Sequence, residues 1–250
     1  MENRFKANIG SGKVSLGCVI TLSDLCVSEL AGDCGMDFCW IDAEHAPHTI
    51  EGVHRHLIAL RGTGCAGLVR VRANDPMLIK PYLDLAPDGV IIPMVNSAEE
   101  AARAVAACRY PLTGIRGCGV RRAVRYGAEN FFDYVKRSET DPMVIIQIEH
   151  MDAVRNLDEI LSVPGVDAIL VGPYDLTISM GKPGQWDDPE VGKTIDTICE
   201  KALKAGKILG AYAECQFERW RKRGVNFLAG ANDTGALING YRQLMKELDV

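Results

Sequence analysis

Short apolar runs alternate with longer amphipathic stretches along the whole chain. The runs are nearly continuous in hydrophobic residues, a pattern typical of strands in a parallel sheet that is covered on both faces. The segments between them have the spacing of amphipathic helices. We expect eight strands, at residues 14–20, 37–42, 67–71, 89–94, 143–149, 167–172, 208–213 and 226–230.

Two of the expected helices have clear sequence signals. Ser97 followed by Glu100 has the spacing of a capping box at a helix N-terminus. Residues 151–163 repeat apolar positions at helical spacing. Eight strand–helix units in a chain of 250 residues match a (β/α)8 barrel of the α/β class, and no linker or change in composition indicates a second domain. We therefore expect one barrel domain over residues 1–250.

Residues 114–142 depart from this alternation. The segment begins GIRGCGVRRAVRYG, is rich in Gly and Arg, and is long for a plain connection. Loops of this length are often functional. The structural alternative is that the segment packs against a neighbouring subunit.

Charge and hydropathy narrow the class of partner. The net charge is -5 and no basic stripe or aromatic–basic interleave occurs, so the footprint of a nucleic-acid-binding protein is missing. The longest apolar runs are too short to span a bilayer, and the N-terminus lacks the apolar core of a signal peptide. These features predict a cytoplasmic protein that acts on a small molecule, away from membranes and nucleic acid.

Cysteine content does not indicate a disulfide framework. The number of cysteines is nine, which is odd, the chain is long, and no C-x-x-C pair occurs. We expect most of them to be small buried hydrophobic residues. They are Cys18, Cys26, Cys34, Cys39, Cys65, Cys108, Cys118, Cys199 and Cys215.

In a (β/α)8 barrel the functional site lies at the C-terminal ends of the strands. Four of the expected strands end on charged residues, whose side chains would face one rim of the barrel. A single acidic residue at such a position is more typical of a helix cap or a solvated loop, whereas a cluster favours a site. The candidates at these ends are Asp42, Glu44, His45, Arg70, Gln147, Glu149, Gly172, Pro173 and Asp175.

The fifth strand predicts a metal or ligand site. Alternation along IIQIE places Gln147 and Glu149 on the same, inward face, where unsatisfied polar groups are costly to bury. Glu149 and Asp175, from adjacent strand ends, are hard oxygen donors that suit Mg2+ or Mn2+ with open coordination positions. A structural zinc site is not indicated, since His45-x-x-His48 alone is a weak signal.

His45 is the candidate general base. It follows a buried strand at the catalytic rim, with Asp42 three residues before it to orient the imidazole. Arg70 would supply a cation for a substrate carboxylate or a developing enolate oxygen. Its structural alternative is a buried ion pair with Glu44 or Asp84. The remaining histidines His54, His56 and His150 are expected to be surface or packing residues.

Six motifs are distributed along the chain: DFCWIDAEHAPHT, NDPMLIKPYLD, GVIIPMVNSAEEA, RYPLTGIRGCG, IIQIE and VDAILVGPYDLT. In these motifs, and in their order and spacing, the chain resembles the HpcH/HpaI aldolase family of class II, metal-dependent pyruvate aldolases. The resemblance extends from about residue 16 to residue 237.

The resemblance implies a modified (β/α)8 barrel of the phosphoenolpyruvate/pyruvate superfamily, usually a homo-hexamer, and a divalent ion such as Mg2+, Mn2+ or Co2+ held by Glu149 and Asp175. It implies that His45, supported by Asp42, is the acid/base residue. It further implies that Arg70 contacts the pyruvate carbonyl oxygen and that Gln147 lines the metal site. The backbone of residues 172–175, including Pro173 and Tyr174, would receive the pyruvate carboxylate.

Some positions depart from the family pattern. Tyr174 replaces a small Ala, Ala86-Pro87-Asp88 replaces Gly-Ala-Gln, and GANDT ends the eighth strand. The loop after Gly119 is about two residues shorter than the family pattern. We expect substrate choice to depend on Tyr174, Tyr212 and residues 114–125.

The reaction that this resemblance implies is a reversible retro-aldol cleavage of a 4-hydroxy-2-oxo acid into pyruvate and an aldehyde. Three alternatives remain open. A Schiff-base aldolase would need a lysine at the rim, and Lys80 and Lys207 are badly placed for it. Another enolate reaction of the superfamily, an acyl-CoA lyase or a decarboxylase, would find a basic groove only among the arginines of residues 116–125. A non-catalytic barrel that binds an oxo acid would have no need of a base.

Overall fold

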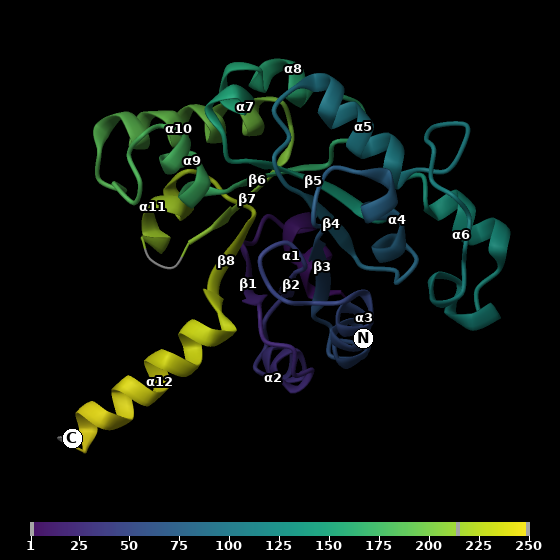
Figure 1. Ribbon diagram of the computed structural model, residues 1–250, viewed down its shortest axis with the longest axis horizontal. Coiled ribbons are helices and arrows are strands. Elements are labelled where there is room, and N and C mark those ends of the chain that lie inside the picture. The colour runs from purple at the N-terminus through teal and green to yellow at the C-terminus, as the bar shows by residue number, and fades with distance from the viewer. Residues whose placement is uncertain (1–2, 214–215, 249–250) are drawn as a thin grey trace.

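The computed structural model describes residues 3–213 and 216–248, and its centre is a closed barrel of eight parallel strands (Figure 1). The strands pair in sequence order, and β8 closes on β1. The expected (β/α)8 fold is therefore confirmed. The strands are β1 Ser15–Ile20, β2 Phe38–Asp42, β3 Ala66–Arg70, β4 Gly89–Ile92, β5 Met143–Ile148, β6 Ala168–Val171, β7 Ile208–Tyr212 and β8 Phe227–Asn232.

The helices lie around the barrel, and most of them cover the outer faces of the strands (Figure 1). They are α1 Arg4–Gly10, α2 Cys26–Asp33, α3 Ile50–Ala59, α4 Pro76–Leu83, α5 Ala98–Cys108, the 3-10 helix η1 Arg122–Gly127, α6 Phe131–Arg137, α7 Met151–Arg155, α8 Leu157–Ser162, α9 Pro173–Ser179, α10 Pro189–Lys204, α11 Phe217–Lys222 and α12 Asp233–Glu247.

Local signals explain where two of these helices begin. The Ser97 hydroxyl accepts a hydrogen bond from the Glu100 amide at 3.2 Å, and the Glu100 carboxylate accepts one from the Asn96 amide at 2.7 Å. The helix expected over residues 151–163 is divided into α7 and α8 at Asn156. The Asn156 amide group donates to the Asn96 carbonyl at 2.8 Å, a tertiary contact that local periodicity does not predict.

Three phenylalanines close the N-terminal end of the barrel interior. Phe5 from α1 meets Phe38 and Phe227, the first residues of β2 and β8, at ring-centroid distances of 5.3 and 5.4 Å. Glycines make room for these rings. A Cβ at Gly17 would lie 2.4 Å from Phe38 Cε2, and one at Gly210 would lie 2.1 Å from Phe227 Cζ. The barrel is therefore packed below its C-terminal rim.

Two segments extend beyond this compact centre (Figure 1). The helix α12 projects away from the barrel and exposes apolar side chains such as Leu237 and Ile238. On the opposite side, η1 and α6 occupy the Gly- and Arg-rich segment that precedes β5. Arg116 of that segment is buried, stacks on the Tyr110 ring at 4.6 Å and pairs with Asp84 at 3.2 Å.

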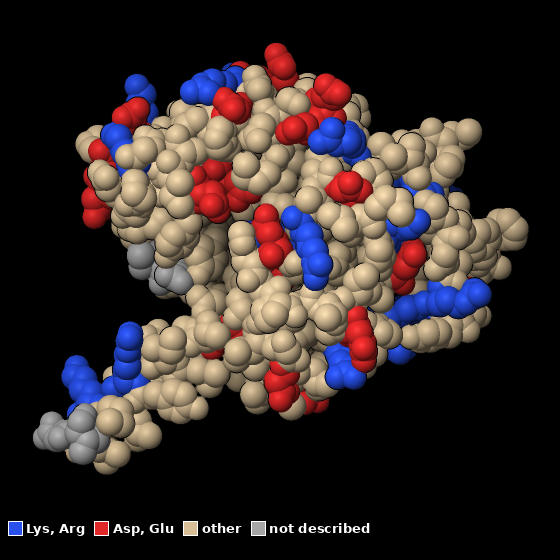
Figure 2. Space-filling model, viewed as in Figure 1, with Lys and Arg blue, Asp and Glu red and all other residues tan. Residues whose placement is uncertain are grey.

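Cysteine burial, helix hydropathy and surface charge complete the description of the fold. Of the eight cysteines there, five are buried, Cys18, Cys39, Cys65, Cys108 and Cys199, as expected for most of them. Cys215 lies outside the described residues. None of the helices in the described part of the chain combines the length and apolar character needed to cross a membrane. Acidic and basic side chains are interspersed on the face shown in Figure 2.

The phenylalanine cluster should be a main source of barrel stability. We expect Phe38→Ala to lower the free energy of unfolding by about 3–5 kcal/mol, because it leaves a cavity among rigid strands. Urea denaturation followed by circular dichroism measures this. Phe132→Ala is the control, since Phe132 is 78% exposed. Equal effects of the two substitutions would contradict the assignment.

Candidate functional site

A pocket of about 440 Å3 lies at the C-terminal rim of the barrel. Side chains from most of the strands converge on it, as the strand-end argument predicts. Its lining includes nine of the ten residues assigned to the site from sequence: Asp42, His45, Arg70, Gln147, Gly172, Pro173, Tyr174, Asp175 and Tyr212. The tenth, Glu149, lies next to the pocket and contacts Gln147.

Arg70 and Asp42 form a buried ion pair between neighbouring strand ends. Arg70 Nε donates to Asp42 Oδ1 at 2.9 Å, and Nη2 donates to Oδ2 at 2.6 Å. Burial alone would raise the pKa of Asp42, but the hydrogen bonds from Arg70 hold it below its ordinary value. Glu44 Oε2 lies 3.2 Å from Arg70 Nε, so the ion pair with Glu44 foreseen as the structural alternative is also present. Asp84 instead pairs with Arg116.

The relation between Asp42 and His45 differs from the expected one. Asp42 Oδ1 accepts hydrogen bonds from the backbone amides of Glu44 at 3.0 Å and His45 at 3.3 Å. The carboxylate next to the imidazole is that of Glu44, whose Oε2 lies 3.6 Å from His45 Nε2. Asp42 thus positions His45 through the backbone, because its own oxygens are occupied by Arg70 and the two amides.

Glu149 is a buried carboxyl immediately after β5. Its Oε1 accepts a hydrogen bond from the Met94 amide at 2.7 Å, and its Oε2 accepts one from Gln147 Nε2. Burial raises the pKa of Glu149 to about 7, and the negative charges of Glu44 and Asp175 add to this effect. Burial also raises the pKa of Glu44 to about 7. Three carboxyl groups, those of Glu44, Glu149 and Asp175, therefore lie close enough for their negative charges to repel one another.

The donor set fits a hard divalent cation, although it is small. No group of three His, Cys, Asp or Glu residues within the described part of the chain is arranged to hold a metal. Two carboxylates suffice for an ion that keeps water ligands, and Glu149 and Asp175 supply hard oxygen atoms. In addition, Gln147 Oε1 is buried and has no hydrogen-bond partner among the described residues. A cation would offset the crowded negative charge.

Gly172 leaves the space that this arrangement needs. A Cβ at Gly172 would lie 2.8 Å from Gln147 Nε2 and 2.9 Å from Glu149 Cβ. Either neighbour would have to move, and both are buried. Pro173 then begins α9, which places Tyr174 and Asp175 in its first turn at the rim of the pocket.

Aromatic side chains form the other wall of the pocket, and sequence reasoning found only part of it. The Tyr174 ring lies 4.9 Å from Trp186 and 5.9 Å from Tyr212, which in turn lies 6.2 Å from Trp40. Trp40 stands inside an apolar strand run and looks like a core residue in sequence. Trp186 stands in the loop before α10, where no motif marks it.

Polar groups continue this wall. Asn232 donates to the Tyr212 hydroxyl at 3.1 Å, and the Thr234 hydroxyl donates to Asn232 Oδ1 at 2.8 Å. Asn232 and Thr234 line the pocket, and the departure GANDT at the end of β8 therefore lies at the site.

Other histidines have structural roles. His56 is buried with Ser28 Oγ 2.9 Å from its Nδ1, and its ring packs against His48 at 4.9 Å. His48 Nε2 lies 3.2 Å from the Ile20 carbonyl oxygen. His150 is the N-cap of α7 and accepts a hydrogen bond from the Asp152 amide at 3.1 Å. These contacts agree with packing and capping.

The raised pKa of Glu149 predicts a pH-dependent stability. The native state keeps this proton up to pH 7, whereas an unfolded glutamate loses it near pH 4.5, so the stability falls as pH rises between these values. In chelator-treated protein, Glu149→Gln should remove on the order of 2 kcal/mol of this fall. Urea denaturation at pH 5 and pH 8 measures it. The exposed substitution Glu51→Gln should leave the dependence intact, and an unchanged dependence in Glu149→Gln would refute the assignment.

Known proteins share the sequence pattern and the fold of this chain. A curated relative from Citrobacter koseri, named 5-keto-4-deoxy-D-glucarate aldolase, is 38% identical over 245 residues, which is 97% of this chain and 95% of the relative. A crystal structure of an HpcH/HpaI aldolase/citrate lyase family protein from Burkholderia cenocepacia superposes with a TM-score of 0.91 at 28% identity. It covers 99% of this chain and 100% of that chain.

A second solved structure, an HpcH/HpaI aldolase from Desulfitobacterium hafniense, gives a TM-score of 0.90 at 28% identity over 97% of this chain and 95% of that one. The model of the family described as HpcH/HpaI aldolase/citrate lyase matches residues 17–240. The resemblance noted in the sequence is thus confirmed, and an aldolase-type lyase activity is supported. The chain belongs to the HpcH/HpaI aldolase/citrate lyase family.

Proposed function

We propose that the rim pocket catalyses the reversible cleavage of a 4-hydroxy-2-oxo acid into pyruvate and an aldehyde. The observation that carries this proposal is the placement of the Arg70 guanidinium, the His45 imidazole and the carboxyl groups of Asp175 and Glu149 around one small cavity. Cleavage of the C3–C4 bond leaves an enolate and needs a base for the 4-hydroxyl proton. The pocket offers a cation for the first and an imidazole for the second.

Arg70 is the residue that would stabilise the enolate oxygen. Asp42 holds its Nε and Nη2 in a bidentate pair, so the guanidinium is already oriented before substrate binds. Its Nη1 makes no hydrogen bond within the described residues and is available to the 2-oxo oxygen. Preorganised donors of this kind stabilise developing charge at little reorganisation cost.

His45 is the residue that would move the proton. Its side chain is 63% exposed and lines the pocket, so its ring can reach the 4-hydroxyl directly or through one water. Glu44, 3.6 Å from His45 Nε2, would stabilise the imidazolium after proton transfer. In the synthetic direction the same imidazolium returns the proton to the new alkoxide.

Glu149 and Asp175 would hold a divalent cation, Mg2+, Mn2+ or Co2+, which when bound supplies Lewis-acid polarisation of the 2-oxo group. Gln147 Oε1 faces the same region and lacks a partner among the described residues, so it is placed to bind a water or a substrate oxygen. The backbone after Gly172 would receive the pyruvate carboxylate, because it forms the N-terminal turn of α9, where backbone amides favour an anion.

The geometry of the rim pocket does not favour a Schiff-base aldolase or an acyl-CoA lyase. Among the described residues, no lysine lines the rim pocket. Lys207 precedes β7 and donates to the Val166 carbonyl at 2.7 Å. The arginines considered for an acyl-CoA groove include Arg122 and Arg125, which line a different cavity at the other end of the barrel. A cytoplasmic homo-hexamer that acts on a small-molecule substrate remains the assembly we propose.

The central test is pyruvate release from a panel of 4-hydroxy-2-oxo acids by chelator-treated protein, with and without added Mg2+, Mn2+ or Co2+. We expect release to require the metal. His45→Asn should lower kcat by roughly 10²–10⁴-fold, because proton transfer loses its base. His54→Asn is the matched control, since His54 is on α3 and does not line the pocket.

The other outcomes are informative. Release that ignores chelation, together with borohydride trapping in the presence of pyruvate, would indicate a lysine mechanism. Binding of oxo acids without release under any of the three metals would make the protein a non-catalytic binder.

Tyr174 should influence the choice of aldehyde. Tyr174 is 45% exposed and lines the pocket, where its ring lies 5.9 Å from that of Tyr212. Tyr174→Ala is expected to change the ratio of kcat/KM between two aldehyde partners by about tenfold, the scale of losing part of one apolar contact surface. Steady-state kinetics of aldol addition to pyruvate measure the ratio. Tyr241→Ala, on the exposed α12, is the control, and an unchanged ratio in Tyr174→Ala would exclude this role.

A further inference from the structure

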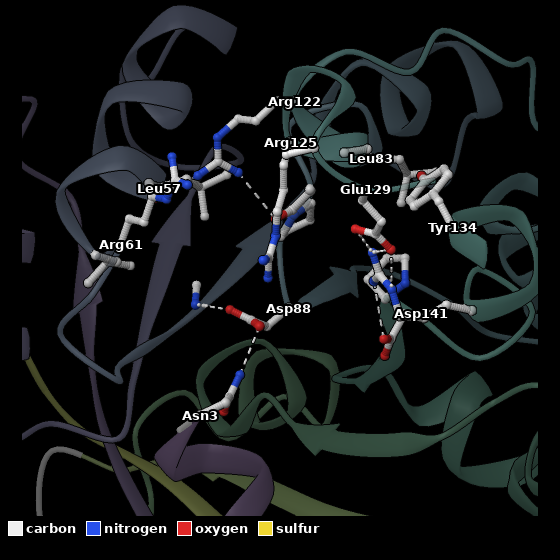
Figure 3. A pocket seen from close by; sticks show the side chains of 18 of the residues that line it. Asn3, Leu57, Arg61, Leu83, Asp88, Arg122, Arg125, Glu129, Tyr134 and Asp141 are labelled. Carbon is white, nitrogen blue, oxygen red and sulfur yellow. Dashed lines mark hydrogen bonds and ion pairs between the residues drawn. The ribbon is translucent and has the colours of Figure 1, made fainter. Parts of the chain in front are cut away.

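A second cavity, of about 920 Å3, lies at the end of the barrel opposite the rim pocket. Its floor is formed where β3, β4 and β5 begin, through Gly67, Asp88 and Pro142. Its outer wall is formed by η1 and α6, the segment for which neither the barrel nor the proposed reaction gives a reason. Figure 3 shows side chains from this wall and from the floor directed toward one space.

The acidic groups on one side of this cavity are mostly satisfied. Arg137 donates to Glu129 at 2.9 Å and lies 3.4 Å from Asp141, which also pairs with Lys6 at 2.7 Å. Asp88, at the floor, accepts hydrogen bonds from the Gly67 amide and from Asn3 Nδ2, both at 2.8 Å (Figure 3). The remaining carboxylate, Asp133, is exposed in the first turn of α6.

The arginines on the other side of the cavity are not paired with carboxylates. Arg122 donates to the carbonyl oxygens of Leu57 at 2.9 Å, of Leu85 and of Ala86, and to no carboxylate. Within the described residues, Arg61 and Arg125 form no hydrogen bond or ion pair through their guanidinium groups. Three guanidinium groups therefore line one wall without a carboxylate partner.

The pKa shifts near this wall also reflect its excess of positive charge. Burial lowers the pKa of the Arg122 guanidinium, and the positive charge of Arg61 lowers it further, while Asp88 acts in the opposite direction. Burial and the charge of Arg122 also lower the pKa of His54, on α3 beside the cavity. The wall is a region of positive potential that an anion would relieve.

The backbone directs Arg125 into the cavity. Arg125 and Tyr126 have φ values of 49° and 57°, in the left-handed region that non-glycine residues rarely adopt. The turn is held by hydrogen bonds from the Tyr126 amide to the Arg121 carbonyl at 2.9 Å and from the Glu129 amide to the Val124 carbonyl at 3.1 Å. In Figure 3 the Arg125 side chain extends toward Asp88. Strained backbone of this kind is concentrated at ligand-binding positions.

We propose that this cavity binds a hydroxylated phosphate ester, with Arg61, Arg122 and Arg125 around the phosphate. Guanidinium groups match the geometry of phosphate oxygens and keep their charge at all relevant pH values. Asp88, toward which Arg125 extends, and Asp133 also line the cavity, where their carboxylates would accept hydrogen bonds from hydroxyls and repel a second anionic group. A sugar monophosphate therefore fits better than a polycarboxylate, and the volume is within the range of small-molecule sites.

Isothermal titration calorimetry with the chelator-treated full chain tests the proposal, with glucose 6-phosphate, inorganic phosphate and glucose as probes. We expect saturable binding of glucose 6-phosphate, weaker binding of phosphate and none of glucose. Arg61→Gln and Arg125→Gln should each weaken binding about tenfold, which corresponds to about 1.4 kcal/mol. Both side chains are exposed, so the melting temperature without ligand should not change.

Two further variants make the result specific to this cavity. Arg242→Gln removes the same charge on the exposed α12 and should leave the affinity unchanged. Arg70→Lys changes the rim pocket and should also leave it unchanged. The proposal is overturned if glucose 6-phosphate gives no saturable heat up to about 10 mM, beyond the range of specific small-molecule affinities. It is equally overturned if Arg70→Lys or Arg242→Gln weakens binding as much as Arg61→Gln does.

Discussion

The ion pair between Asp42 and Arg70 joins the C-terminal ends of β2 and β3, and the organisation of the rim pocket depends on it. The two residues are register partners across the parallel pair, so the barrel itself brings them together. Asp42 also holds the backbone amides of Glu44 and His45. One carboxylate therefore fixes the orientation of the guanidinium and the path of the loop that carries the imidazole. Losing it would remove the bidentate contact with the guanidinium and both contacts with the loop amides at once.

A second constraint is the concentration of negative charge beside this pair. The negative charges of Glu44, Glu149 and Asp175 repel one another. The neighbouring cation, Arg70, makes its bidentate hydrogen bonds with Asp42. Burying several carboxyl groups near one another costs stability unless a ligand or cation compensates. The protein therefore keeps an arrangement that is unfavourable for folding, which is typical of a site selected for binding and chemistry.

Much of this organisation follows from the sequence. The apolar runs predict the eight strands, and the strand-end rule then places Arg70, Gln147 and Asp175 at one rim, because both depend on local pattern and on the topology of parallel barrels. Contacts between segments far apart in the chain could not be predicted from local sequence pattern. The division of a helix at Asn156 needs the Asn96 carbonyl, and the pairing of Asp42 with Arg70 depends on strand register.

The aromatic wall shows a different limit of sequence reasoning. A tryptophan inside an apolar strand, such as Trp40, has the same local pattern as any core residue, and Trp186 stands in an irregular loop. Trp40 lines the pocket beside Tyr212, and Trp186 packs against the Tyr174 ring, which itself lines the pocket. The second cavity was equally hidden, since the sequence marked residues 114–142 as unusual but not the face of the barrel that they cover.

The packed lower half of the barrel has a kinetic consequence. Phe5, Phe38 and Phe227 fill the interior at the N-terminal end, and Leu68, Ile145 and other buried side chains belong to the same interior cluster. These described residues fill the barrel interior, so in the proposed reaction the substrate and both products would share a single mouth at the rim. In the proposed cleavage, the aldehyde would lie toward the exposed Tyr174 and pyruvate deeper, beside Gly172. Departure would then be sequential, with the aldehyde leaving first and pyruvate held until the mouth is clear.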